Sequence, residues 1–276
     1  MPGPSQGAVP PGRMVTVGRQ RRGRQGRGDG NGADDTDAMD PTRQIIVALD
    51  CDTRQAAQAV VDRLGDACRF YKVGLELLTA VGPQFVRDLV AQGKEVFLDL
   101  KLFEIPNSVA GAVRAAGALG VSMVTVHGMG GKGIMSAAVD AARDHPGLRV
   151  LALTVVTSMT DADLADIGVS DPAEGQVLRP ARLAREAGCH GVIASPREVA
   201  PLRAVLGGDA LIVTPGVVMP GEPAADHARP ATPGAAIADG ASYVVVGRSV
   251  THAWDPLSAL GRFQADVSAA TPLAPR

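Results

Sequence analysis

The sequence predicts an α/β protein with a single closed (β/α)8 TIM barrel and a disordered N-terminal tail. Eight short apolar segments alternate with helical patterns, which is typical of parallel strands joined by helices. No GxGxxG follows the first segment, which disfavours a doubly wound nucleotide-binding sheet. Polar residues recur where the predicted strands end, at the edge where barrels build their sites. An open doubly wound sheet is the alternative.

Composition narrows the class of protein. The chain has 276 residues, of which 46% are hydrophobic, and this suits one large domain or two small ones. The net charge of −2 and the aromatic content of 3% favour neither a nucleic-acid partner nor a base-stacking surface. We therefore expect no nucleic acid among the partners of this protein.

The cysteines and the apolar segments indicate a compartment. Cys51, Cys68 and Cys189 lie far apart, without a CxxC pair, so a disulfide framework or a zinc site is not expected. No apolar run approaches the roughly 18 residues of a membrane span. We expect no metal, no membrane association and a cytoplasmic location.

The first 43 residues differ from the rest of the chain. They are rich in Gly, Pro, Gln and Arg, then become acidic, and they show no hydrophobic periodicity. Such a composition cannot form a packed core. We expect a disordered tail over residues 1–43 and a catalytic barrel domain over residues 44–276.

The first half of the predicted barrel consists of four strand-and-helix pairs. Each strand is a short run of large or β-branched apolar residues, and each helix repeats apolar residues every three or four positions. The predicted strands are 45–49, 70–73, the stretch that begins at 96, and 121–126, and the helices that follow them are 56–64, 77–89, 107–116 and 137–142. A Gly-rich turn separates the fourth strand from its helix.

The second half follows the same rhythm with longer connections. The predicted strands are 149–156, 191–194, 211–214 and 242–246, with helices over about 160–187 (interrupted by a loop near 170), from 196 onward, and at the end of the chain. The segment 215–233, after the seventh strand, is rich in Pro and Gly, which suits a lid or a ligand-binding loop.

The third strand carries the charged residues that predict a site. Asp99 and Lys101 are two positions apart, so their side chains point to the same face. Burying a carboxylate or an ammonium is costly unless the two pair. Glu104 follows just before a Pro ends the strand. We interpret this acid-lysine-acid array as catalytic, and a structural ion pair is the alternative.

Other strands end in polar residues of the same kind. These residues are Asp50, Lys72, His127, Thr157 and Arg248. Gly247 and Arg248 open the last helix, and the loops after strands seven and eight of a barrel often bind phosphate through backbone N–H groups. We therefore predict a phosphate site at Gly247 and Arg248.

Several separate motifs carry a resemblance to a known family. They are Val-Ala-Leu-Asp50, Tyr-Lys72-Val-Gly, Phe-Leu-Asp99-Leu-Lys101, Ile-Pro-Asn-Ser108, Val-His127-Gly, Thr-Val-Val-Thr157-Ser158-Met, Val-Thr-Pro-Gly216 and Val-Gly-Arg248-Ser-Val. With these motifs in this order, the chain from about 44 to 262 resembles the orotidine 5′-phosphate decarboxylase family, which forms UMP.

The resemblance implies a cofactor-free decarboxylase with a nucleotide substrate, dimeric and with each site completed across the interface. Lys101 would protonate C6 of the pyrimidine, and Asp99 would lie beside the substrate carboxylate. The resemblance also implies that Glu104 and Ser108 reach the partner's site and contact the ribose. Asp50 and Lys72 would bind the ribose hydroxyls, and Thr157 and Ser158 would lie near the pyrimidine. Gly247 and Arg248 would bind the phosphate.

Three ligand positions depart from the family pattern. The family motif Asp-x-Lys-x-x-Asp has Glu104 in its last place, Val218 stands where an Arg is usual, and His227 stands for a phosphate-side Gln. His227 could still donate one hydrogen bond. These departures leave open a family member retuned to another nucleotide or sugar phosphate, an analogue-resistant copy, or a non-catalytic nucleotide-binding protein.

Overall fold

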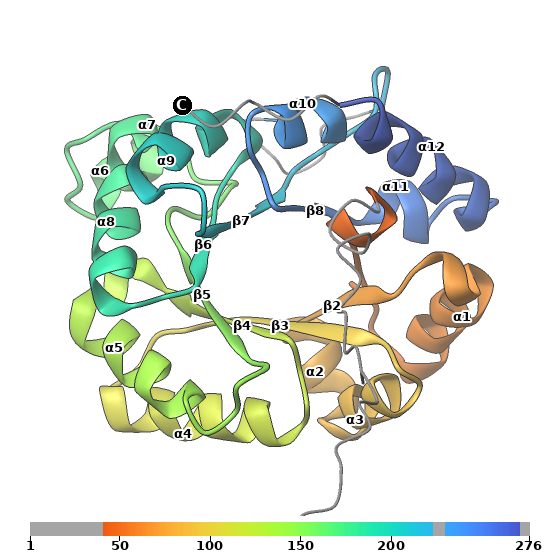
Figure 1. The fold of residues 1–276 in the computed structure, drawn as a ribbon, viewed down its shortest axis with the longest axis horizontal. Helices are drawn as coiled ribbons and strands as arrows, with labels where there is room; N and C mark the ends of the chain where they lie inside the picture. The colour runs from red at the N-terminus through yellow and green to blue at the C-terminus, as the bar shows by residue number, and fades with distance from the viewer. Residues whose placement is uncertain (1–40, 223–229, 271–276) are drawn as a thin grey trace, which may run out of the picture. The chain divides into compact units, whose positions relative to one another are not determined.

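Eight parallel strands close into a barrel in this computed structural model, which describes residues 41–222 and 230–270 (Figure 1). The strands follow one another around the barrel in chain order, and β8 pairs with β1 to close it. They are β1 (Ile45–Ala48), β2 (Phe70–Gly74), β3 (Glu95–Leu102), β4 (Met123–His127), β5 (Arg149–Leu153), β6 (Gly191–Ile193), β7 (Leu211–Pro215) and β8 (Tyr243–Val246). The predicted (β/α)8 barrel is confirmed.

The helices form the outer ring in Figure 1. The α-helices are α1 (Arg54–Leu64), α2 (Leu75–Val81), α3 (Gln84–Ala91), α4 (Pro106–Ala118), α5 (Gly131–Ala142), α6 (Asp161–Asp166), α7 (Ala173–Gln176), α8 (Leu178–Ala187), α9 (Val199–Leu206), α10 (Pro233–Ala238), α11 (Arg248–Thr251) and α12 (Pro256–Ser268). Short 3-10 turns precede some of the strands and helices, as at η2 (Pro41–Gln44).

The strands are apolar on both faces because each face is covered. One set of side chains fills the barrel interior, and its members are Ile46, Ala48, Phe70, Phe97, Met123, Leu151, Leu153, Ile193, Val213 and Val245. A larger cluster fills the space between strands and helices. Parallel sheets covered on both faces read as continuous apolar runs, which is why the eight strands could be found in the sequence.

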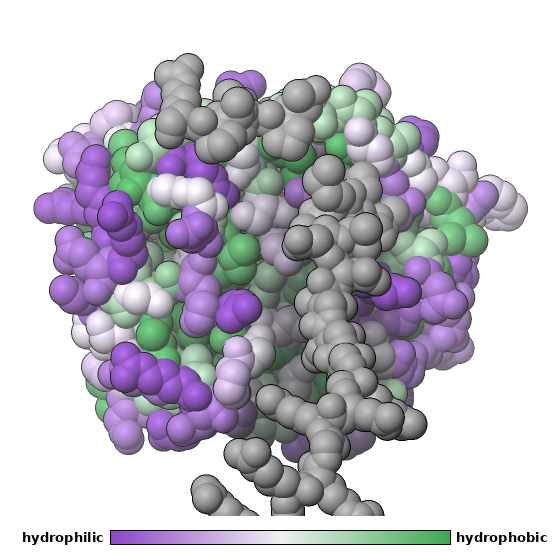
Figure 2. Space-filling view, in the orientation of Figure 1, coloured by the Kyte–Doolittle hydropathy of each residue, from purple (hydrophilic) through white to green (hydrophobic). Residues whose placement is uncertain are grey.

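The helices bury one stripe each and expose the rest. In α1 the buried residues are Ala57, Val60, Val61 and Leu64, spaced as one helical face requires, and the Thr53 hydroxyl caps the helix by accepting a hydrogen bond from the Ala56 N–H. Figure 2 shows hydrophilic residues gathered over the outer helices at the left of the view, with apolar residues between them.

Several details of the element predictions were wrong. Gly247 and Arg248 stand at the start of the short helix α11 and not at the start of the last helix, α12. The single helix expected over 77–89 is two helices, α2 and α3, because Gly82 adopts a φ of 72° and Pro83 follows it. Helix α10 was not predicted. Strand β5 ends at Leu153 rather than at residue 156.

The predicted tail, residues 1–43, lies outside the described residues except for its last three, which belong to η2. None of the helices in the described part of the chain is both long enough and apolar enough to cross a membrane.

Candidate active site

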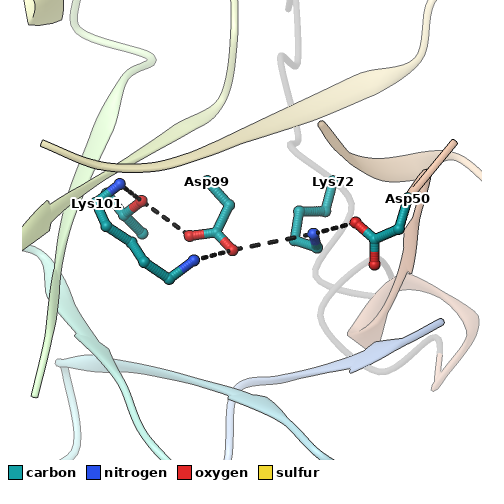
Figure 3. Close-up of polar contacts among 5 residues, drawn as sticks. Asp50, Lys72, Asp99 and Lys101 are labelled. Atoms are coloured by element: carbon teal, nitrogen blue, oxygen red, sulfur yellow. Dashed lines mark hydrogen bonds and ion pairs between the residues drawn. The ribbon is translucent and has the colours of Figure 1, made fainter. Parts of the chain in front are cut away.

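Four charged side chains form a row at the carboxyl ends of the first three strands (Figure 3). Lys72 on β2 donates to Asp50 Oδ1 at 2.8 Å, and its Nζ lies 4.0 Å from Asp99 Oδ2. Lys101 on β3 donates to the same Asp99 oxygen at 2.8 Å. The signs alternate along the row, so each charge has an opposite neighbour.

The middle of the row is the most deeply buried. The side chains of Asp99 and Lys72 are 12% and 13% exposed, whereas Lys101 is 33% and Asp50 is 53% exposed. A carboxylate at this depth is stable only when it is paired and hydrogen-bonded. Asp99 lies against both lysines. The spacing of Asp99 and Lys101 predicted the pair between those two residues, whereas the approach of Lys72 to Asp99 was not predicted.

Strand β3 is irregular where the row ends. Lys101 has a φ of 51°, the only positive φ of a non-Gly residue in the described chain. The pairing with β4 shifts between Leu98 and Leu102. Thr125 on β4 lies opposite this irregularity, and its Oγ1 accepts a hydrogen bond from Lys101 N and donates one to Asp99 Oδ1. The sequence prediction missed Thr125, although it is a polar residue within an otherwise apolar strand.

The row lines one side of a cavity of about 190 Å³ at this end of the barrel. Its other lining residues are Ala48, Phe97, Leu153, Val156, Thr157, Ile193, Pro215, Gly216, Val245 and Gly247. Most of these are apolar and come from β5 to β8, so the cavity sets charged groups against an apolar wall. Such a cavity suits a ligand that has both a charged and an apolar part.

A second hollow of about 450 Å³ shares Asp50 with the first. It lies toward α1 and α11 and is lined by Asp50, Cys51, Asp52, Ala56, Ala59, Val60, Arg63, Glu76, Thr251 and His252. The charged side chain of Asp50 therefore borders both spaces.

Glu104 and Ser108 lie away from the cavity lining. Both are exposed at the start of α4. Hydrogen bonds from the Ser108 side chain and the Ile105 backbone hold the pKa of the Glu104 carboxyl below its usual range. Within the described residues no ion pair joins Glu104 to Lys101 or Lys72. Glu104 therefore interacts with the start of the helix that follows it in the chain.

Of the other predicted site residues, some line the cavity and some lie outside it. Thr157 and Gly247 line the cavity, whereas Ser158 and Arg248 are exposed outside its lining. His227 falls outside the described residues. Val218 is half-buried, and its N–H donates to Ala231 O at 3.0 Å.

His127 lies beside the row. Burial, followed by the positive charge of Lys101, lowers its pKa below the usual range. Its Nδ1 accepts from Met129 N at 3.3 Å, and its ring lies 5.6 Å from that of Phe103.

In the described part of the chain, no group of three or more His, Cys, Asp or Glu side chains is placed to hold a metal ion.

Comparisons with known proteins agree on one family. The family model for orotidine 5′-phosphate decarboxylase / HUMPS proteins matches residues 43–263. A protein of Idiomarina loihiensis named orotidine 5′-phosphate decarboxylase is 47% identical over 219 residues, which are 79% of this chain and 94% of that protein. A protein of the same name from Moorella thermoacetica is 45% identical over 231 residues, covering 81% and 92%. The crystal structure of orotidine 5′-phosphate decarboxylase from Lactobacillus acidophilus matches with a TM-score of 0.73 at 36% identity, covering 82% of this chain and 99% of that chain.

Proposed function

This chain belongs to the orotidine 5′-phosphate decarboxylase / HUMPS family, and we propose that it is a carboxy-lyase that converts orotidine 5′-phosphate to UMP through a C6 carbanion protonated by Lys101. The observation that carries the mechanism is the ion pair of 2.8 Å between Lys101 Nζ and Asp99 Oδ2 at the mouth of the cavity. It supplies a held ammonium where charge would develop.

The chemistry follows from that ammonium. When the bond from C6 to the carboxylate breaks, its electron pair stays on C6 and CO2 leaves. The vinyl carbanion has no ring position to which its charge can spread. A cation fixed beside C6 stabilises this charge before the proton moves. Lys101 then gives one Nζ proton to C6 and regains one from solvent.

Asp99 acts on both the lysine and the substrate in this proposal. Its hydrogen bond with Lys101 Nζ, at 2.8 Å, holds the ammonium in a fixed direction. A substrate carboxylate seated beside Asp99 meets a second negative charge in a half-enclosed site, and this repulsion disappears when CO2 leaves. The interaction therefore favours the transition state over the bound substrate.

The rest of the nucleotide is assigned to the remaining predicted residues. Asp50 and Lys72 bind the ribose hydroxyls, Thr157 and Ser158 contact the pyrimidine, and the backbone of Gly247 with the guanidinium of Arg248 binds the phosphate. His227 adds a hydrogen bond to the phosphate. No metal or cofactor enters any of these steps.

We further propose a homodimer with shared sites. Phe103 and Ile105, which flank Glu104, are 61% and 62% exposed, and an apolar patch of this kind is typical of a subunit interface. Across such an interface Glu104 and Ser108 reach the partner's site. We also place the protein in the cytoplasm, because Cys51, Cys68 and Cys189 are all free thiols.

The test is direct. Purified protein is mixed with orotidine 5′-phosphate in the presence of a chelator, and the loss of substrate ultraviolet absorbance is followed beside the Lys101→Ala variant. We expect turnover in the wild type and none in the variant. A folded wild-type protein without turnover would refute the proposal. The search would then turn to other nucleotides and sugar phosphates, because Val218 stands where the family usually has an Arg.

A further inference from the structure

Strand β3 leaves its regular pairing just where the reactive lysine stands. Leu98 pairs with Val124 and Leu102 pairs with Val126, so four steps along β3 face two steps along β4. The surplus residues form a bulge, and Lys101 takes a left-handed backbone conformation within it. Residues with a side chain adopt this conformation unfavourably, and it persists only where the surroundings hold it.

One side chain holds the bulge. Thr125 is the residue between the two β4 positions that keep their pairing, and it is fully buried. Its Oγ1 accepts a hydrogen bond of 2.9 Å from Lys101 N. Without this hydroxyl, an N–H displaced from the ladder by the bulge would lose its acceptor, and a buried donor without a partner is costly.

The same hydroxyl also fixes the carboxylate. Thr125 Oγ1 donates to Asp99 Oδ1 at 3.0 Å, and the other oxygen of Asp99 accepts from Lys101 Nζ at 2.8 Å. The three residues therefore close a ring that joins the backbone of Lys101, the hydroxyl, the carboxylate and the ammonium. A ring of this kind determines the orientation of Asp99 and both ends of Lys101.

We propose that Thr125 is a positioning residue for the reaction, because its hydroxyl couples the bulged backbone of Lys101 to the carboxylate of Asp99 and so sets where the ammonium stands in the cavity. This inference rests on the proposed function. Thr125 does not line the cavity, so it acts through Asp99 and Lys101 and not on the substrate.

The first test compares Thr125→Val with Thr125→Ser. Valine keeps the volume and loses the hydroxyl, whereas serine keeps the hydroxyl. Because a misplacement of about 1 Å costs about a hundredfold in rate, we expect kcat to fall by about tenfold to a hundredfold in the valine variant. KM should change by less than about threefold, since binding groups elsewhere are untouched. The serine variant should recover most of kcat.

Thr214→Val is the matched control. Thr214 is also a fully buried threonine on a barrel strand, but its hydroxyl has no hydrogen-bond partner among the described residues. The same substitution there should leave kcat unchanged. If Thr125→Val unfolds at the assay temperature, Thr125→Ala, which relieves any misfit of the second valine methyl, replaces it in the comparison.

A second measurement does not depend on turnover. Only the neutral amine reacts with acetic anhydride, so a firmly paired ammonium is protected. The rate of Lys101 acetylation, read by mass spectrometry against the surface residue Lys132, should rise at least about threefold in Thr125→Val if the hydroxyl holds the pair. An unchanged acetylation rate would overturn the inference, as would equal loss of kcat in the valine and serine variants. If the wild type shows no decarboxylation, the proposed function fails by itself, and acetylation still decides the role of Thr125.

Discussion

Gly74 lies directly beside the ammonium of Lys72: a Cβ added at Gly74 would stand 3.2 Å from Lys72 Nζ and 3.7 Å from Asp50 Oδ1. The backbone of Gly74, with φ −96° and ψ −171°, is open to any residue. The glycine therefore relieves a tight contact with Lys72 and is not needed for its backbone conformation. Its missing side chain leaves room for the ion pair between Lys72 and Asp50.

Replacing Gly74 by alanine should disturb the site and spare the fold. The methyl group displaces the flexible end of Lys72, so stability should change by less than about 0.5 kcal/mol, while kcat/KM for orotidine 5′-phosphate falls by about tenfold. Gly261→Ala, in α12 with no atom within 4 Å of the added Cβ, is the control. Steady-state kinetics and thermal unfolding of both variants provide the check, and equal kinetics in the two would contradict the assigned role of Lys72.

The charged row was predictable because its cause lies in the sequence pattern. Parallel strands bring their carboxyl ends to one edge, so polar side chains at the ends of β1, β2 and β3 were expected on the same side of the barrel. The break between α2 and α3 also had a signal in the Gly82-Pro83 pair, which a purely periodic reading overlooked.

Other features depend on geometry that no local pattern encodes. The left-handed backbone of Lys101 arises from a register shift between two strands, and the partnership of Thr125 with Asp99 follows from that shift. Glu104 was placed by its spacing from Lys101, but its carboxylate interacts with the start of α4. Sequence spacing predicts the position of a residue on its strand or helix. The contacts of its side chain depend on which residues the fold packs against it.

Stability should fall in mild acid, in part because of His190. Burial, followed by the charge of Arg149, lowers the pKa of His190 below 6.5, and its Nδ1 accepts from Val150 N at 3.0 Å. Below about pH 6.5 the unfolded chain binds the proton more readily than the folded protein, so this contribution to stability is present above that pH and declines as pH falls.

The variant His190→Asn isolates this effect, since asparagine retains an acceptor and cannot be protonated. Urea unfolding at pH 7.5 and 5.5 should show a smaller loss of stability in the variant, by at most about 1 kcal/mol because the side chain is partly solvated. His127, whose pKa is lowered in the same direction, remains in both proteins and cancels in the comparison. Parallel pH dependences would exclude His190 as a contributor.

Arg203 stabilises the loops that lead into β7 and β8. Its guanidinium donates to Gly240 O from both Nε and an Nη atom, at 3.1 and 2.7 Å, and to three carbonyls between α9 and β7, those of Gly207, Gly208 and Ala210, at 2.6, 3.1 and 2.7 Å. A lysine ammonium cannot reach acceptors in so many directions.

We therefore expect Arg203→Lys to lower the free energy of unfolding by about 1–3 kcal/mol. Arg185→Lys provides the comparison, because the Arg185 side chain is exposed and donates to one carbonyl, that of Val205. Thermal and urea unfolding of the two variants should differ clearly. If Arg203→Lys were no less stable than Arg185→Lys, the several hydrogen bonds of Arg203 would be redundant.

The proposed sharing of sites between two subunits can be tested by mixing two inactive variants of the chain. If Glu104 serves the partner's cavity, a dimer of one Lys101→Ala chain and one Glu104→Gln chain contains one site in which both residues are intact. Random re-association makes about half of the dimers hybrid, so about a quarter of wild-type activity should return. A mixture of Lys101→Ala with Asp99→Ala is the control, since both residues belong to the same chain's row and the hybrid cannot regain an intact lysine-aspartate pair in either site.

In that control each hybrid dimer has one site that lacks Lys101 and one site that lacks Asp99. No site is complete, so no activity should return. Recovery in the first mixture alone therefore assigns Glu104 to the partner's site. Recovery in neither mixture, with hybrid dimers demonstrated by mass spectrometry, would mean that Glu104 serves its own subunit. Its hydrogen bonds with Ser108 and Ile105 would then be a helix-capping arrangement, and the exposed Phe103 and Ile105 would need another explanation.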